Sequence, residues 1–144
     1  MRARHPIARF AIVGRAPTPA VQALAGEGVI VTGEVADVRP WLAAASVVVA
    51  PLLTARGVQN KVLEAMAMAC PVVATRQAAE GIDHAGTIRV AEGASSFAAE
   101  VAALLGRPAA NPAARTHVLR RYSWPARLAP LGDLLGLPPR REAA

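Results

Sequence analysis

Two positively charged side chains lie beside the start of one predicted helix. Apolar residues at three- and four-residue spacing predict a helix over Val58–Ala69, with Arg56 and Lys61 at its amino end. A helix amino terminus carries partial positive charge and is stabilised by anions, yet no acidic residue caps this one. Free backbone N–H groups and nearby cations together form an anion site. The segment therefore predicts that a phosphate group binds at this helix end.

A polar stripe on the same predicted helix supports the anion site but has an alternative interpretation. The stripe consists of Gly57, Asn60, Lys61 and Glu64 and is confined to the first turns. Lys61 and Glu64 could instead form a surface ion pair. Lysine preceding glutamate is the less favourable order, and even a well-arranged pair contributes at most ~0.5 kcal/mol. Lys61 is also the only lysine in the sequence, which favours a specific use for a compact ammonium group.

Short apolar runs alternate along the chain with segments rich in alanine and leucine. Because the runs are apolar throughout, they predict strands covered on both faces: Phe10–Val13, Val29–Thr32, Val47–Ala50, Val72–Ala74 and Ile88–Val90. The segments between them predict helices over Thr18–Ala25, Val38–Ala44, Val58–Ala69 and Ser95–Leu105. Thr18, followed by a proline, is the expected cap of the first helix. The alternation is typical of an α/β fold, a Rossmann-like parallel sheet with helices on both faces.

The character of the sequence changes after Gly106, where prolines interrupt the chain. Two further helices are predicted, over Ala113–Arg121 and Ser123–Leu135, and the residues from Pro138 onward are expected to be frayed. We therefore divide the chain into a partial Rossmann-like domain, residues 1–121, and a helical tail, residues 122–144.

The start of the sequence resembles the middle of a domain. The segment from Arg2 to Pro6 has the character of a helix end that leads directly into the first strand. We therefore expect the Rossmann-like domain to be incomplete at its amino terminus.

Composition limits the classes of protein to which the chain can belong. With 144 residues and 53% hydrophobic content, the chain is sufficient for one packed domain. A net charge of +6 is typical of proteins that bind nucleic acid. However, nearly all of the positive charge is arginine, and the two Trp, two Phe and one Tyr are few for stacking on bases. We expect no nucleic-acid partner.

Signals for membrane insertion, export and metal binding are weak. The longest uncharged stretch, Pro40–Ala55, is shorter than the ~20 residues that span a bilayer, and no leader-like segment follows Met1. Cys70 is the only cysteine, so a cysteine-rich metal site is excluded, and it is expected to be buried rather than reactive. The three histidines lie far apart. We expect a cytoplasmic protein that holds no metal.

The helix and strand around Glu64 carry a family resemblance. Leu63-Glu64-Ala65-Met66-Ala67 followed by Pro71-Val72-Val73-Ala74 resembles the signature of the group 1 retaining glycosyltransferases, which have the two-domain GT-B fold. Phe10–Gly14 and Val31–Asp37 are similar to the second domain of that family in order and spacing, and Arg121–Trp124 is similar to its helical tail. The resemblance covers about residues 8–105.

The resemblance implies a donor pocket lined by two glutamates that are separated by seven residues. Glu64 matches the second glutamate, which hydrogen-bonds the ribose hydroxyls of the donor nucleotide. Arg56 stands where the first would be, and this reversal of charge prevents transfer of the family's donor-sugar contact. The backbone at Gly57 and Val58 would face the sugar or the diphosphate.

The resemblance also implies how the leaving group is stabilised. Lys61 and the helix amides would hold the departing nucleoside diphosphate, with no metal required, and Asn60 lies on the same polar stripe. Arg56, Lys61 and Glu64 are therefore the candidate catalytic residues. The loop near Val35 matches a region that contacts the base through its main chain. Farther along the chain, Glu80 and Asp83 follow the Val72–Ala74 strand and could approach the donor from the next loop, but a functional role is the less favoured interpretation for them.

The function implied by the resemblance is the donor-binding half of a glycosyltransferase that performs retaining, hexosyl-type transfer. Its donor would be a nucleotide-diphosphate sugar of the UDP or GDP type, and no separate cofactor is expected. The segment Arg56–Lys61 further resembles sugar transferases of exopolysaccharide and PEP-CTERM protein-sorting systems. The missing partner would be an N-terminal acceptor domain. The full-length protein would be cytoplasmic, which leaves open a peripheral association with the inner face of the membrane.

The family also has an early strand–helix unit, and the resemblance places its strand between those at Phe10 and Val47. That unit is expected to be missing here. An alternative function is therefore a truncated, catalytically inactive nucleotide-binding or interaction module. A phosphorylated regulator is disfavoured because the strand ends at Gly14, Gly33 and Pro51 provide no acidic pocket, and a classical dehydrogenase because no G-x-G-x-x-G follows the first strand.

Overall fold

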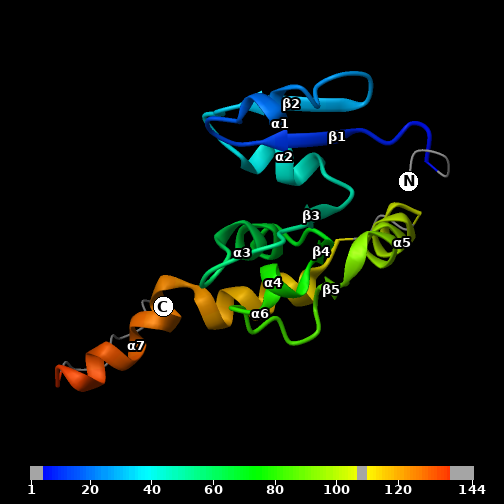
Figure 1. Ribbon diagram of the computed structural model, residues 1–144. Coiled ribbons are helices and arrows are strands. Elements are labelled where there is room, and N and C mark those ends of the chain that lie inside the picture. Colours follow the sequence, from blue (N-terminus) through cyan, green and yellow to red (C-terminus); the bar gives the residue numbers. More distant parts are fainter. Residues whose placement is uncertain (1–4, 107–109, 137–144) are drawn as a thin grey trace.

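The computed structural model describes residues 5–106 and 110–136 and shows an α/β chain (Figure 1). Its strands are β1 (Phe10–Val13), β2 (Val29–Gly33), β3 (Val48–Ala50), β4 (Val72–Ala74) and β5 (Arg89–Val90). Its helices are α1 (Pro19–Gln22), α2 (Arg39–Ala44), α3 (Asn60–Ala67), α4 (Arg76–Ala79), α5 (Gly93–Leu105), α6 (Pro112–Tyr122) and α7 (Trp124–Leu134). The sequence-based expectations for residues 2–4 and 138–144 lie outside the described residues.

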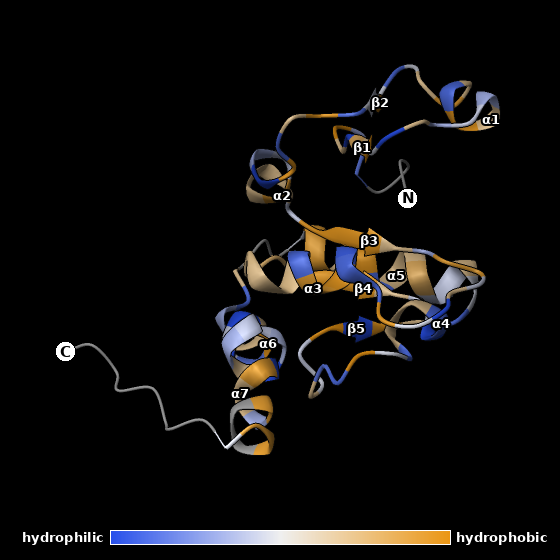
Figure 2. Cartoon of the chain, turned by 90° about the vertical axis from the view of Figure 1, so that its left-hand side faces the viewer, coloured by the Kyte–Doolittle hydropathy of each residue, from blue (hydrophilic) through white to orange (hydrophobic). Residues whose placement is uncertain are grey.

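The strands pair in parallel, as predicted, but they form two sheets. β1 pairs with β2, and the second sheet has the order β3-β4-β5. In both views, β1–β2 lie apart from β3, and the chain passes from one sheet to the other through α2 (Figures 1 and 2). The division falls between β1 and β3, which is where the family resemblance places the strand that is expected to be missing.

β4 is the centre of the larger sheet, and both of its faces are covered. Val72 and Ala74 belong to a buried cluster with residues of α3 and α6, whereas Val73 belongs to a second cluster with Val101 of α5. Successive residues of a strand point to opposite faces, so α3 and α5 cover different faces of the sheet. This arrangement confirms the predicted helices on both faces. Figure 2 shows the core as mostly hydrophobic ribbon around β3.

Helix α6 is joined to the larger sheet by Asn111, the residue that caps it. The Asn111 N–H donates to the Ala69 carbonyl oxygen at 2.7 Å, and its side-chain amide donates to the Thr87 carbonyl oxygen at 2.6 Å. Its side-chain oxygen accepts from the Ala114 N–H at 3.1 Å, which caps the helix. The apolar residues of α6, Ala114 and Val118, are buried in the same cluster as α3. Therefore α6 is part of the core.

The first sheet lacks a core of its own. Within residues 5–49 no residue is buried, and the core begins at Ala50. Phe10 in β1 and Ile30 in β2 remain 44% and 40% exposed. The expectation that these strands are covered on both faces is thus wrong for β1 and β2. In the described residues, β1 and β2 form a sheet of their own, and the short helices α1 and α2 next to them bury no residue.

Two helices differ from prediction in ways that the local contacts explain. Thr18 caps α1, as predicted, by accepting from the Val21 N–H at 3.4 Å. However, α1 ends at Gln22 rather than Ala25, because Gly26 and Val29 exchange two backbone hydrogen bonds that require non-helical chain. Helix α4 was not predicted, since four residues are too few to show a periodicity.

Helix α7 projects away from the sheets (Figure 1), and several of its apolar side chains are exposed. Trp124, at its start, is 79% exposed, and Leu128, Leu131 and Leu134 are exposed in the turns that follow. The Arg127 guanidinium lies 5.7 Å from the centre of the Tyr122 ring, which connects α7 to α6. Among the residues of α7 whose burial the structure describes, none is buried in the core.

We predict that Met66→Ala destabilises the fold by about 2–5 kcal/mol, because the side chain is fully buried between α3 and β4 and its removal leaves a cavity. Urea denaturation followed by circular dichroism measures the loss. Met68→Ala is the matched control. Met68 caps the carboxyl end of α3 and is only half-buried, so its substitution should lower the free energy of unfolding clearly less. Equal denaturation midpoints for the two variants would contradict the described core.

Candidate functional site

The candidate site is the loop that joins β3 to α3, at the carboxyl end of β3. Residues 51–59 form this loop, which we call the donor loop. The Thr75 N–H, at the end of the neighbouring β4, donates to the Ala50 carbonyl oxygen at 3.1 Å. The Thr75 hydroxyl donates to the Leu52 carbonyl oxygen at 2.7 Å. The donor loop therefore leaves the sheet at its carboxyl edge, where ligands bind in open parallel sheets.

A turn at Gly57 sets where α3 begins. Gly57 has φ of +63°, a left-handed conformation that glycine adopts without strain. The Gln59 side-chain amide lies 3.2 Å from the Arg56 carbonyl oxygen and 3.3 Å from the Gly57 carbonyl oxygen, both of which it can donate to. These contacts hold Val58 in the loop, 45% exposed. The prediction that the helix begins at Val58 is therefore wrong, and α3 begins at Asn60.

The amino end of α3 is positively charged and carries no acidic cap. Gln59 occupies the cap position without a side-chain hydrogen bond to the helix, and the first turn contains no acidic residue. The N–H groups of Val62 and Leu63 both point to the Gln59 carbonyl oxygen, at 2.9 and 3.4 Å. Arg56 and Lys61 are exposed. Among the side chains that the structure describes, no carboxylate forms an ion pair with either of them.

The polar stripe predicted from the sequence lies on the solvent-facing side of α3. Asn60, Lys61 and Glu64 are all exposed, while Val62, Ala65 and Met66 are buried on the other side. The alternative interpretation, an ion pair between Lys61 and Glu64, is not found among the described ion pairs. The carboxylate of Glu64 and the ammonium of Lys61 are thus both accessible to a ligand.

An open recess of about 630 Å³ lies beside the donor loop. Its lining is Leu53, Thr54, Ala55, Arg56 and Gln77. Gln77 comes from α4, a helix that is too short to be predicted from periodicity. No sequence pattern therefore pointed to Gln77 as a lining residue. Of the predicted site residues, Arg56 lines this recess, Gly57 and Val58 follow it in the donor loop, and Asn60, Lys61 and Glu64 lie on α3.

Val35 lies in a different part of the structure from the other predicted site residues. It follows β2, in the smaller sheet, and is half-buried. It is not part of the lining of the recess beside the donor loop. The structure therefore brings together the residues from Arg56 to Glu64, and it leaves Val35 at the carboxyl end of β2.

Asp83 forms its contacts with α6. A role for it at the donor was the less favoured interpretation of the sequence. Its N–H donates to the Tyr122 hydroxyl at 2.6 Å, and its carboxylate lies 3.1 Å from the Arg121 Nε. His117 Nε2 donates to its carbonyl oxygen at 2.8 Å. These contacts fasten α6 to the loop before β5 and give Asp83 a structural role.

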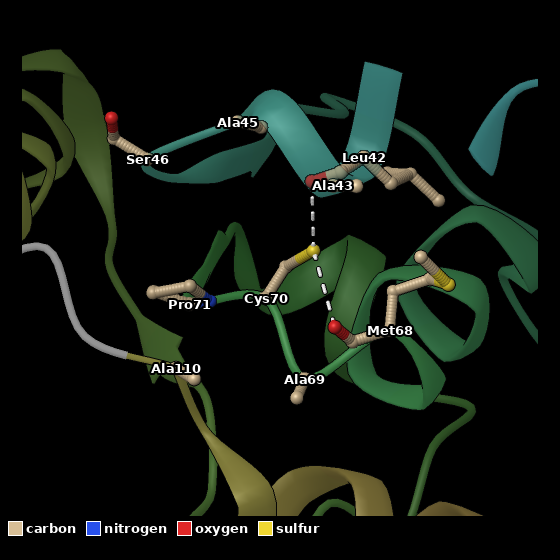
Figure 3. A pocket seen from close by; sticks show the side chains of 9 residues that line it. All are labelled: Leu42, Ala43, Ala45, Ser46, Met68, Ala69, Cys70, Pro71 and Ala110. Carbon is tan, nitrogen blue, oxygen red and sulfur yellow. Dashed lines mark hydrogen bonds between the residues drawn. The ribbon is translucent and has the colours of Figure 1, made fainter. Parts of the chain in front are cut away.

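A second, smaller pocket of about 200 Å³ lies at the opposite end of the larger sheet (Figure 3). Ser46 and Pro71, which line it, precede β3 and β4, so it opens at the amino ends of the strands. The Cys70 thiol donates to the Leu42 carbonyl oxygen at 3.2 Å, which joins α2 to the end of α3 (Figure 3). Its position at the amino ends of the strands separates this pocket from the donor loop.

The described residues show neither a cluster of metal ligands nor a helix that could cross a membrane. Residues 5–106 and 110–136 contain no group of three or more histidine, cysteine, aspartate or glutamate side chains placed to hold a metal ion. Across the same residues, none of the helices combines the length and the apolar character that crossing a bilayer requires.

The larger sheet has parallel strands, helices on both faces and, at its carboxyl edge, the donor loop with Arg56. These features define a Rossmann-like α/β protein. The profile of the family described as "Glycosyl transferases group 1" matches residues 1–107. The chain therefore belongs to the group 1 glycosyltransferases, as its sequence motifs indicated.

A solved structure and the curated proteins complete the comparison. The chain is similar to AviGT4, a glycosyltransferase involved in avilamycin A biosynthesis, with a TM-score of 0.61 and 22% sequence identity. The match covers 88% of this chain and 42% of AviGT4, so the chain spans less than half the length of that protein. At this identity the likeness shows the fold. No curated protein matches the sequence significantly.

We predict that Cys70 reacts with a thiol reagent such as Ellman's reagent on the order of 100-fold more slowly in the native chain than in urea. Its side chain is buried, and burial raises the pKa of the thiol, which lowers the concentration of the reactive thiolate. Cys70 is the only cysteine, so the reaction reports on it alone. Similar rates in native and unfolded chain would contradict the described position.

Proposed function

We propose that this chain is the donor-binding domain of a retaining, hexosyl-type glycosyltransferase, and that its donor is a nucleotide-diphosphate sugar of the UDP or GDP type. The observation that carries the proposal is the amino end of α3. There, Arg56 and Lys61 lie beside uncapped helix amides, without a carboxylate partner among the described residues. In a group 1 glycosyltransferase, a diphosphate is the anion that this arrangement fits.

Lys61 and the amides of α3 would act on the leaving group. As the bond between the sugar and the diphosphate breaks, negative charge develops on the departing phosphate oxygens. Positive groups that are already in place stabilise that charge without reorganising. The exposure of Lys61 and its position in the first turn support this role. The proposal assigns no step to a metal ion.

Glu64 would bind the ribose. It lies one turn beyond Asn60 on the exposed side of α3, and a carboxylate can accept hydrogen bonds from two neighbouring hydroxyls. The peptide between Gly57 and Val58 would face the sugar or the diphosphate. Arg56 lines the recess where the family has a glutamate, so a sugar that carries an acidic group is compatible with this wall. The loop at Val35 would contact the base.

The full-length protein would supply the acceptor domain and one more strand. β1 and β3 are each paired along a single edge in the described residues, and residues 5–49 contain no buried residue. A strand between β1 and β3 would join the two sheets and cover the exposed apolar side chains of β1. The exposed apolar side chains of α7, Trp124 foremost, would pack on the acceptor domain. We place the protein in surface or exopolysaccharide synthesis, at the cytoplasmic side of the membrane.

One observation favours a second candidate function, a nucleotide-binding or interaction module without catalytic activity. Arg56 occupies the position at which the family has a glutamate. Such a module would keep the contacts of Lys61 and Glu64 with a nucleotide but would transfer no sugar.

We predict that Lys61→Met and Glu64→Ala weaken nucleotide binding in different ways. Lys61→Met should lower the affinity for UDP or GDP roughly tenfold, about 1.4 kcal/mol, but leave the affinity for the nucleoside unchanged, because Lys61 contacts only the diphosphate. Glu64→Ala should weaken nucleotide and nucleoside alike, because both contain the ribose. Calorimetric titration with UDP, GDP, uridine and guanosine measures these affinities.

Matched controls remove the same charges elsewhere. Arg120→Met removes an exposed cation of α6, and Glu100→Ala removes a carboxylate of α5. Neither should change the affinity by more than about twofold. Wild-type affinity in both Lys61→Met and Glu64→Ala, with circular dichroism showing an intact fold, would reject the proposed site.

We predict that the DNA upstream of the Met1 codon encodes, in frame, a further strand–helix unit and an acceptor domain. The longer protein should protect the amides of β1 and β3 from hydrogen exchange more strongly than the 144-residue chain does. The amides of β4, which is paired on both edges, serve as the control. An in-frame stop codon immediately upstream would contradict this expectation and favour the non-catalytic module.

A further inference from the structure

The segment that follows β4 touches the donor loop at a point where a side chain has no room. A Cβ atom at Gly81 would lie 2.7 Å from the Gly57 carbonyl oxygen, 2.9 Å from the Gly57 carbonyl carbon and 3.1 Å from the Val58 nitrogen. All three are backbone atoms, which cannot move aside as a flexible side chain can. The backbone of Gly81 therefore packs directly against the peptide between Gly57 and Val58.

The same peptide is held from a second direction. The Gln59 amide lies 3.3 Å from the Gly57 carbonyl oxygen, and the left-handed conformation of Gly57 fixes how that oxygen points. Gly81 closes the other side of the carbonyl group. The orientation of the Gly57–Val58 peptide is thus set jointly by the start of α3 and by the loop after α4.

The beginning of the donor loop is fixed by the other end of this segment. The Thr75 hydroxyl donates to the Leu52 carbonyl oxygen at 2.7 Å, and its oxygen accepts from the Ala78 N–H at 3.3 Å. Thr75 therefore caps α4 and binds the donor loop at once. The short helix α4, whose own residues Ala78 and Ala79 are buried, connects Thr75 to Gly81.

We propose that Gly81 and Thr75 are positioning residues of the donor site, which hold the Gly57–Val58 peptide and the start of the donor loop in the arrangement that binds the diphosphate. This inference rests on the proposed function. Neither residue need touch the donor, since each acts through the backbone of the donor loop. Preorganised backbone groups bind an anion more tightly than mobile ones because less order is lost on binding.

The test compares Gly81→Ala with Gly26→Ala in the same 144-residue chain. Gly26 has open space where its Cβ would lie, so it is the matched control. In the ligand-free protein, Gly81→Ala should accelerate hydrogen exchange of the donor-loop amides, and Gly26→Ala should not. In titrations, Gly81→Ala should lower the affinity for UDP or GDP at least tenfold and leave the affinity for the nucleoside within twofold.

A second pair of variants covers the case in which Gly81→Ala does not fold. Thr75→Val keeps the size of the side chain but removes the hydroxyl, whereas Thr75→Ser keeps the hydroxyl. Thr75→Val should lower the affinity for the diphosphate nucleotide, and Thr75→Ser should restore it. A purely structural role would instead lower the thermal midpoint and change nucleotide and nucleoside affinities in parallel.

The outcomes separate this inference from the proposed function. If the wild-type chain binds UDP or GDP but folded Gly81→Ala and Thr75→Val bind it equally well, the positioning role is overturned and the donor site stands. If wild-type chain binds neither nucleotide, the proposed function is overturned and the positioning role with it. Unchanged exchange of the donor loop in Gly81→Ala also overturns the positioning role.

Discussion

The burial of β4 between two apolar layers is the constraint on which the rest of the structure depends. Val72 and Ala74 face α3 and α6, Val73 faces α5, and all three are fully buried. Because β4 pairs with β3 and β5 in parallel, this packing brings the carboxyl ends of the strands to one edge. The donor loop leaves β3 at that edge, and α3 directs its amino end toward it. The position of the candidate site therefore follows from the core, and its charge comes from Arg56 and Lys61.

Periodicity was sufficient to predict the parts of the fold that are buried. All the predicted strands exist, and α3 and α5 were found because each buries one side against the sheet. The exposure of β1 and β2 could not be predicted, since their apolar runs read like those of β3 and β4. Whether an apolar strand is covered depends on neighbours that come from elsewhere in the chain.

The charged residues of the candidate site could be predicted from residue types and spacing. The conformation of its backbone depends on tertiary contacts and could not. Arg56 and Lys61 could be selected because cations at an uncapped helix end are unusual in any sequence, whereas Glu64 was selected from the family motif that contains it. The start of α3 at Asn60 could not, because the Gln59 amide competes with the helix for the same backbone. Gln77 and Gly81 escaped notice because they reach the donor loop from a different strand connection.

The uneven distribution of burial along the chain has a consequence for how it comes apart. No residue of 5–49 is fully buried, and only Leu42 and the residues at β3 pack against the core from that segment, whereas the buried residues that the structure describes all lie between Ala50 and Val118. Opening β1 and β2 therefore exposes little new apolar surface, and it costs less free energy than opening β4. The cooperative folding unit begins at β3, and the first sheet frays from it as a separate unit, which makes the early loops the first sites of proteolytic cleavage.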